Sequence, residues 1–135
     1  MKKNVFAADQ ELVQALLQRS SPIPCNQNSI LFSQGQPASG LFILQSGEAM
    51  LMMESRPGKP VMCLQAASGS LLGMPAICGN APYTLTATAR KGSDVRFIKR
   101  DDFEDAIQAE PRLAIRVIQL VAAEVIAARR ALSEI

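Results

Sequence analysis

Between residues 29 and 98, short apolar runs alternate with turn residues at intervals of about ten residues. Glycine and proline separate the runs, and both residues favour the tight turns that join neighbouring strands. This pattern is typical of a β-sandwich or a jelly roll. The predicted strands cover residues 29–32, 41–45, 48–53, 61–65, 84–90 and 94–98, and a hairpin loop is predicted at 56–58.

Helical patterns flank the predicted strands. Asp9 is a suitable N-cap for a short amphipathic helix, because leucines and a valine follow it at helical spacing until Pro22 interrupts the run. Asp101 and Asp102 favour the positive end of a helix that begins near residue 100, and Pro111 suits the first turn of a last helix. The predicted organisation is one α+β domain, residues 1–135, with an N-terminal helix at 9–21, a β-roll at 22–99 and C-terminal helices at 100–135 that include the last helix at 111–135.

The stretch 69–89 has the outline of a loop that holds a phosphate group. Gly69 ends an apolar segment, Gly73 opens a short turn of helix, and Pro82 leads into a threonine-rich strand. Backbone N–H groups at the start of a helix attract anions. In this order of residues the stretch resembles the phosphate-binding cassette of cyclic nucleotide-binding domains, the sensor domains of Crp/Fnr-type regulators.

The family's cassette reads roughly Phe-Gly-Glu-Leu-Ala, a short variable stretch, and then Pro-Arg-Ala-Ala-Thr. Aligned without a gap, the chain matches it at Leu72, Gly73, Ala76, Pro82 and Thr86. The order of residues in 32–47 strengthens the resemblance, and the family's structural glycines correspond to Gly35, Gly47 and Gly69. The resemblance implies a cyclic nucleotide-binding-like β-jelly-roll, a double-stranded β-helix, flanked by an N-terminal helix and two C-terminal helices.

Two polar cassette residues of the family are replaced in this chain. In the family, the glutamate accepts hydrogen bonds from the ribose 2′-hydroxyl and the arginine pairs with the cyclic phosphate, but Met74 and Tyr83 stand in their places. Neither side chain carries a charge, and Pro75 removes a backbone N–H from the loop. Cyclic AMP binding is therefore doubtful, and no cofactor is expected. The resemblance places the ligand-binding cassette at Leu72, Gly73, Met74, Pro75, Ala76, Pro82, Tyr83 and Thr84.

Two interpretations of these replacements stay open. In the first, a pocket has closed around core residues, namely Met74, Ile77, Tyr83 and Leu85. In the second, an apolar or aromatic ligand occupies the same pocket. A replacement for the missing positive charge would require Arg90 or Arg96 to face inward, and the sequence does not determine their direction.

The last predicted helix carries two apolar stripes. Alternating heptad spacing with β-branched residues at the a positions predicts the seam of a parallel two-stranded coiled coil, and hence a homodimer. A second stripe, Leu113, Val117 and Leu120, is expected to pack on the helix's own β-domain. Glu124 and Arg129 are expected to form an ion pair between the two helices. The predicted seam residues are Ala114, Ile118, Val121, Val125, Ala128, Leu132 and Ile135.

Composition excludes several classes of function. The chain has no histidine, and its three cysteines, Cys25, Cys63 and Cys78, lack the spacing of a zinc or iron–sulfur motif, so buried structural thiols are expected. Without histidine, neither the usual general base nor a cupin-type metal site is expected, and the protein is not expected to be an enzyme. The net charge of +2 indicates no basic surface for DNA, and no uninterrupted apolar run is long enough for a membrane span. A cytoplasmic protein is expected.

The leading functional hypothesis is a small regulatory ligand-sensing module, active in signal transduction or transcription regulation. A ligand in the pocket would alter the pairing or docking of the last helix. The alternative is a ligand-free interaction protein that pairs with itself, or with a longer DNA-binding relative, through the same helix. In the family's transcription regulators a helix-turn-helix domain follows this helix, and direct DNA binding is not expected here because the sequence ends at Ile135.

Overall fold

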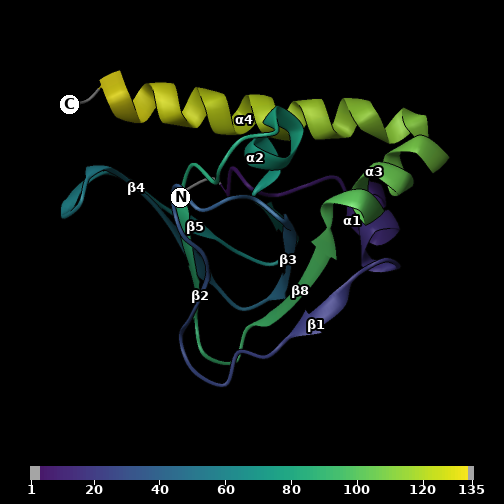
Figure 1. The fold of residues 1–135 in the computed structure, drawn as a ribbon, viewed down its shortest axis with the longest axis horizontal. Helices are drawn as coiled ribbons and strands as arrows, with labels where there is room; N and C mark the ends of the chain where they lie inside the picture. Colours follow the sequence, from purple (N-terminus) through teal and green to yellow (C-terminus); the bar gives the residue numbers. More distant parts are fainter. Residues whose placement is uncertain (1–3, 134–135) are drawn as a thin grey trace.

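The computed structural model describes residues 4–133. Figure 1 shows a roll of two β-sheets, with the long last helix lying across one end of the roll and a short helix between them. The elements, in chain order, are α1 (Gln10–Leu17), β1 (Ser21–Ile23), β2 (Ser29–Phe32), β3 (Gly40–Ser46), β4 (Ala49–Arg56), β5 (Lys59–Ala66), β6 (Ser70–Leu72), α2 (Met74–Gly79), β7 (Thr86–Ala89), β8 (Asp94–Lys99), α3 (Arg100–Ala109), a 3₁₀ turn (Pro111–Leu113) and α4 (Ala114–Ser133).

The strands form two antiparallel sheets of four strands each, ordered β1-β8-β3-β6 and β2-β7-β4-β5. Strands distant in the sequence lie side by side, as when β3 pairs with both β6 and β8. Within residues 4–133 only the β4–β5 pair is a simple hairpin, closed by Pro57 and Gly58. The predicted jelly roll with an N-terminal helix and C-terminal helices is therefore confirmed.

Two hydrophobic clusters stabilise this arrangement, and β3 contributes to both. Phe42 and Leu44 point into the roll, whereas Leu41 and Ile43 point outward against the helices. Successive side chains of a strand face opposite sides of a sheet, so a strand covered on both sides is apolar throughout. The outer cluster fixes α1, α3 and the first half of α4 to the sheet that contains β3.

The helix boundaries differ in part from those expected. The Asp9 carboxylate caps α1 as predicted, accepting hydrogen bonds from the backbone N–H groups of Glu11 at 3.1 Å and Leu12 at 3.3 Å. The expected helix end at residue 21 is wrong, because α1 ends at Leu17 and Ser21 begins β1, which pairs with β8. The strands β1 and β6 were not predicted, and the last helix begins with a 3₁₀ turn. Residues 134–135, which the prediction included in the last helix, lie outside the described residues.

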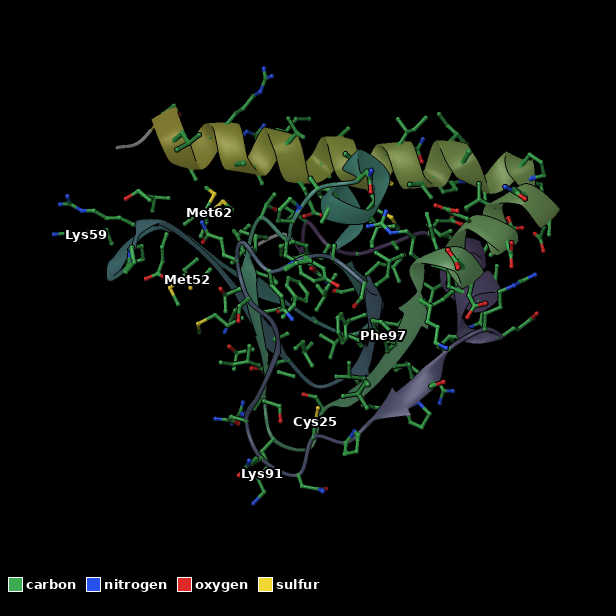
Figure 2. All side chains as sticks on the ribbon, in the orientation of Figure 1. Cys25, Met52, Lys59, Met62, Lys91 and Phe97 are labelled. Carbon is green, nitrogen blue, oxygen red and sulfur yellow. The ribbon has the colours of Figure 1, made fainter. Side chains whose placement is uncertain are left out.

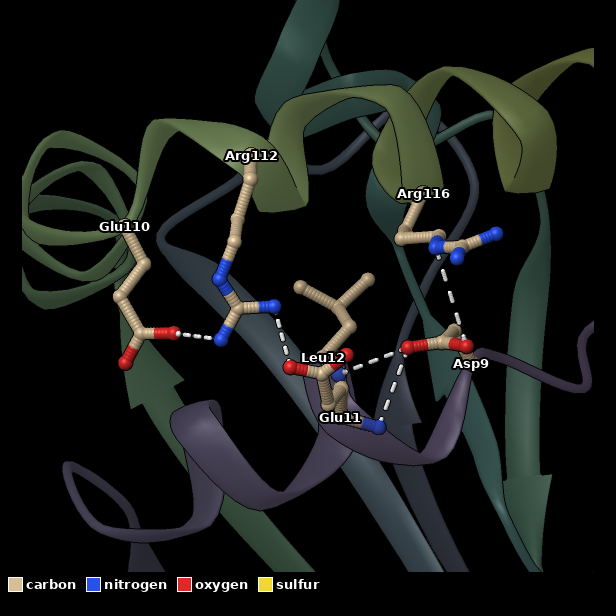
Figure 3. A network of polar contacts seen from close by, with 6 residues as sticks. All are labelled: Asp9, Glu11, Leu12, Glu110, Arg112 and Arg116. Atoms are coloured by element: carbon tan, nitrogen blue, oxygen red, sulfur yellow. Dashed lines mark hydrogen bonds and ion pairs between the residues drawn. The ribbon is translucent and has the colours of Figure 1, made fainter.

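Ion pairs fasten the start of the last helix to α1 (Figure 3). The Arg112 guanidinium donates hydrogen bonds to the carboxylates of Glu11 and, at 2.9 Å, Glu110. Arg116 lies 3.8 Å from the carboxylate of Asp9, the residue that caps α1. The pKa of Arg112 is raised, first because its guanidinium donates a hydrogen bond to Glu11 and then because of that residue's negative charge.

Candidate functional site

A cavity of about 280 Å³ lies between the roll and the C-terminal half of α4. We refer to it as the α4 pocket. Figure 2 shows Met62, on β5, beneath this half of the helix. Most of the lining is apolar, and the residues come from the N-terminal segment, β4, β5, α2, the loop before β7 and α4: Phe6, Met53, Met62, Leu64, Pro75, Thr84, Leu85, Glu124, Val125, Ala128 and Leu132.

Glu124 is the only charged residue that lines the α4 pocket in the described part of the chain. Its side chain points from α4 toward the roll, and only 9% of the residue is exposed. The carboxylate oxygen Oε2 has no hydrogen-bond partner among residues 4–133. Burial raises the pKa of Glu124 from 4.5 to about 8, because the apolar surroundings disfavour the charged form.

Tyr83 fills the interior of the roll beside this pocket. Its ring stacks on Phe32, with centroids 4.1 Å apart, and the residue is 3% exposed. Its hydroxyl donates a hydrogen bond to the carbonyl of Gly40 at 2.6 Å and accepts one from the Gly40 backbone N–H at 3.3 Å. The Tyr83 hydroxyl therefore already uses its one donor hydrogen and one acceptor position within the protein.

The turn from β6 into α2 is shaped around the Tyr83 ring. Gly73 has a φ of 97°, and a Cβ atom at this position would lie 3.0 Å from the Tyr83 ring. Glycine thus serves both the left-handed backbone and the close approach of the ring. Met74, the next residue, is fully buried in the outer cluster against the helices and not in the α4 pocket.

The predicted cassette residues separate into three groups. Two of them, Pro75 and Thr84, line the α4 pocket. Three others line a gap of about 10 Å³ between that pocket and the roll interior, too small for a ligand: Gly73, Ala76 and Tyr83. The remaining three line neither space: Leu72, Met74 and Pro82.

The arginines considered as replacement charges do not reach the pocket. Arg90 is exposed and pairs with Glu48 at 3.3 Å. Arg96 donates hydrogen bonds to the hydroxyl and carbonyl of Ser20, at 2.7 and 2.8 Å. Arg100 is likewise used within the fold, where it donates to two backbone carbonyls.

Sequence reasoning missed the residue that most distinguishes the pocket. Glu124 was expected to pair with Arg129 of a second helix, and this is wrong for the structure described, because Glu124 faces the roll of its own chain. A signal was present in the sequence. The stripe of Leu113, Val117 and Leu120 continues at helical spacing to Glu124, so a carboxylate occupies a position on the buried face of α4.

Beside its buried stripe, α4 carries exposed apolar side chains. The buried stripe of Leu113, Val117 and Leu120 is confirmed. Of the predicted seam residues, Ile118 is 60% exposed and Leu132 is 52% exposed. Val125 is also exposed. Three further seam residues are half-buried: Ala114, Val121 and Ala128. Ile135 lies outside the described residues, and the seam itself stays a prediction.

The cysteines do not form a site, and the expectation of three buried thiols is only partly met. Cys25 is buried, but Cys63 and Cys78 are exposed, so the prediction is wrong for these two. Desolvation and then the charge of Glu124 raise the pKa of Cys78. Within residues 4–133 no group of three or more histidine, cysteine or acidic side chains could hold a metal ion. None of the helices in this range combines the length and the apolar character that crossing a membrane requires.

Comparisons with known proteins agree on the fold. The family model described as "Cyclic nucleotide-binding domain" matches residues 23–110. The Thermus thermophilus catabolite activator protein superposes with a TM-score of 0.75 at 22% identity, over 93% of this chain and 59% of that one. The sensor domain of the regulator DNR from Pseudomonas aeruginosa gives 0.65 at 21% identity, over 94% and 83%.

A third solved structure carries a bound small molecule. CprK, crystallised in its oxidised form with o-chlorophenolacetic acid, superposes with a TM-score of 0.76 at 16% identity, over all of this chain and 54% of that one. The present chain thus spans between half and two thirds of the catabolite activator protein and of CprK. No curated protein sequence matches the chain.

Proposed function

The chain belongs to the cyclic nucleotide-binding domain family, and from this premise we propose that it is a regulatory ligand-sensing module. A small molecule binds in the α4 pocket and changes how α4 docks on the roll. Through α4 the same event alters the pairing of two copies of the chain. The protein acts by binding, not by catalysis.

One observation carries this proposal: the pocket and the predicted pairing seam share residues. Val125, Ala128 and Leu132 line the α4 pocket and also belong to the seam. A ligand that moves these side chains moves the surface offered to a second helix. Binding and pairing are then coupled, because each changes the free energy of the same element.

Cyclic AMP does not fit this pocket. Its phosphate carries a negative charge, and no arginine or lysine of the described residues lines the α4 pocket to receive it. The charged side chain present, Glu124, would repel the phosphate when ionised. The place of the family's arginine is taken by Tyr83, whose hydroxyl is bonded to Gly40. The ligand therefore differs in charge from a cyclic nucleotide.

Small-molecule sensing without a nucleotide is consistent with the comparison to CprK, whose solved structure contains an aromatic acid. The apolar lining of the α4 pocket suits a molecule with an apolar or aromatic body. Its volume of about 280 Å³ is slightly below the range of about 300–1,000 Å³ of most ligand pockets. A ligand of one or two rings is the expected size.

The binding half of the proposal is tested with 1-naphthalenemethanol, a neutral aromatic probe. At saturation it should raise the melting temperature of the wild-type protein by mass action. The variant Ala128→Phe places a large side chain in the pocket and should abolish the rise, while circular dichroism confirms that it folds. An unchanged wild-type melting temperature would contradict the binding half.

The pairing half is tested by sedimentation. Ile118 and Ile126 are similarly exposed on α4, at 60% and 51%, but only Ile118 lies on the predicted seam. Ile118→Glu should therefore produce a monomer, whereas Ile126→Glu, the matched control, should remain a dimer like the wild type. A wild-type protein that sediments as a monomer at high micromolar concentration would exclude the homodimer.

The alternative function, a ligand-free interaction protein, is favoured by a different observation. The exposed apolar face of α4 is present without any ligand, and Tyr83 already fills the interior of the roll. In that case no probe would change the melting temperature, and Ile118→Glu would still produce a monomer. Pairing with a longer DNA-binding relative would appear as a heterodimer in the same sedimentation experiment.

A further inference from the structure

The lining of the α4 pocket combines apolar side chains with one buried carboxylate. Glu124 stands on the inner face of α4, where its neighbours along the stripe are leucine, valine and alanine. Only 9% of the residue is exposed, and Oε2 has no hydrogen-bond partner in the described chain. An unpartnered carboxylate in such surroundings lowers the stability of the fold, unless something else supplies a partner.

Among residues 4–133, no positively charged side chain lines the pocket beside Glu124. Arg129 and Arg130, the basic residues nearest in sequence, lie on the exposed side of α4. The residues that β4 and β5 direct into the pocket are Met53, Met62 and Leu64, which do not titrate. On α2 the titratable side chain coupled to Glu124 is the Cys78 thiol, which carries no positive charge in either state.

We propose that the α4 pocket binds a small, largely apolar molecule bearing a protonated nitrogen, which donates a charge-assisted hydrogen bond to the Glu124 carboxylate. This inference rests on the ligand-sensing function proposed above and names the chemical class of the ligand. The apolar body occupies the space between Met62, Leu64 and Leu85, and the ammonium group faces Glu124.

Three features of the pocket favour an apolar cation over an anionic, a neutral or a strongly hydrophilic ligand. An anion would be repelled by the ionised Glu124 carboxylate, with no basic residue among 4–133 lining the pocket to offset the repulsion. A neutral ligand leaves the carboxylate without a charged partner, and hydrogen bonds to ionised groups are about twice as strong as neutral ones. A strongly hydrophilic cation such as a polyamine would leave the apolar lining uncovered.

The inference fixes the direction of the pH dependence of binding. A cation requires the ionised carboxylate, and burial raises the pKa of Glu124 in the free protein to about 8. Binding then releases a proton below this pH. The affinity should rise about tenfold per pH unit up to about pH 8 and level off above it. A ligand that accepts a hydrogen bond from the protonated carboxyl would show the opposite trend.

The test compares three probes that share one ring system: 1-naphthylmethylamine, 1-naphthalenemethanol and 1-naphthoate. Calorimetry at about pH 8 should give an affinity for the amine at least ten times that for the alcohol, and the weakest affinity for the carboxylate. In Glu124→Gln, an isosteric variant without the charge, the ratio of amine to alcohol should fall to near one. Glu104→Gln removes an exposed carboxylate from α3 and should leave the ratio unchanged.

The possible outcomes distinguish a failure of the cationic-ligand inference from a failure of the proposed ligand-sensing function. Equal affinities for the amine and the alcohol, or an amine affinity that does not change in Glu124→Gln, would overturn the cation while leaving the pocket as a ligand site. Tighter binding of the amine below pH 8 than above it would also overturn the cation and leave the pocket as a ligand site. Failure of all three probes to bind the wild type would overturn the inference together with the binding half of the proposed function.

Discussion

The two halves of α4 are held to the protein in different ways. In the first half, Val117 and Leu120 are buried in the outer cluster, and Arg116 approaches the acidic residue that caps α1. In the second half, Glu124 and Leu132 face a cavity of about 280 Å³. One helix is therefore packed and ion-paired near its start, whereas near its end it borders a cavity and packs on the roll only through small residues, Ala128 and Ala131.

This difference indicates where a ligand can act. Regions with few buried apolar contacts open at low free energy, whereas packed regions open only with the whole protein. A molecule that fills the cavity adds contacts to the second half alone, so it changes the docking of that half about a fixed start. The seam residues that line the pocket, Val125, Ala128 and Leu132, lie in the half that responds.

The largest expected loss of stability comes from a substitution in the packed first half of α4. Leu120→Ala removes a side chain that is almost fully buried, and such changes cost about 2–5 kcal/mol through lost burial and the remaining cavity. Leu132→Ala, the matched change in the second half, alters a half-exposed side chain and should cost less than about 0.5 kcal/mol. Chemical denaturation at low protein concentration, where pairing does not contribute, measures both.

Equal losses from the two leucine variants would contradict the comparison. They would mean that the second half of α4 is packed as firmly as the first. In that case a ligand would have to displace a docked helix, and the α4 pocket would not bind it by simple filling.

The fold was predictable because its signals are local. Gly35, Gly47 and Gly69, which the resemblance placed at the family's structural glycines, have φ angles of 88°, 95° and 89°, the left-handed backbone that glycine adopts most readily. The strands missed, β1 and β6, have three residues each, too short to show alternation, and both are defined by partners far away in the sequence. Patterns within a short stretch of sequence do not show which distant strand will pair with it.

The site was less predictable, because it depends on where side chains point. The replacement of the family's charged residues by Met74 and Tyr83 was visible in the sequence. Their directions were not: Met74 packs against the helices, and Tyr83 packs inside the roll. Glu124 was predicted to form an ion pair between two helices, although it continues, at helical spacing, the stripe that begins at Leu113 and was expected to pack on the β-domain.

An intermediate effect should come from Glu124→Gln, and its size should depend on pH. The unfolded chain ionises Glu124 near pH 4.5, whereas the folded protein holds the proton to about pH 8. Between these values the unfolded state binds fewer protons, so the free energy of unfolding falls as pH rises. Glutamine removes this loss of stability but buries an amide. We expect the free energy of unfolding of Glu124→Gln to exceed that of the wild type by about 1–2 kcal/mol at neutral pH.

The pH profile of the free energy of unfolding distinguishes the titration of Glu124 from an effect of packing. Wild-type stability should decline from about pH 5 to about pH 8 relative to Glu124→Gln, and the difference should stop growing above that range. At about pH 4 the advantage of the variant should vanish. A constant difference at every pH would show that Glu124 acts through packing, and that its carboxylate is not kept from water in solution.

The smallest effect should come from the ion pairs at the start of α4. Arg112→Gln removes contacts to Glu11 and Glu110 (Figure 3), but the arginine is exposed, and exposed ion pairs contribute little to stability. The melting temperature should fall by less than in Leu120→Ala, and the fall should vanish in about 1 M salt, where charges are screened. Arg129→Gln, an exposed arginine in the second half, is the matched control and should change nothing. If Arg112→Gln destabilised the protein as much as Leu120→Ala, then charge and not packing would hold the first half of α4, and high salt alone should loosen the helix along its whole length.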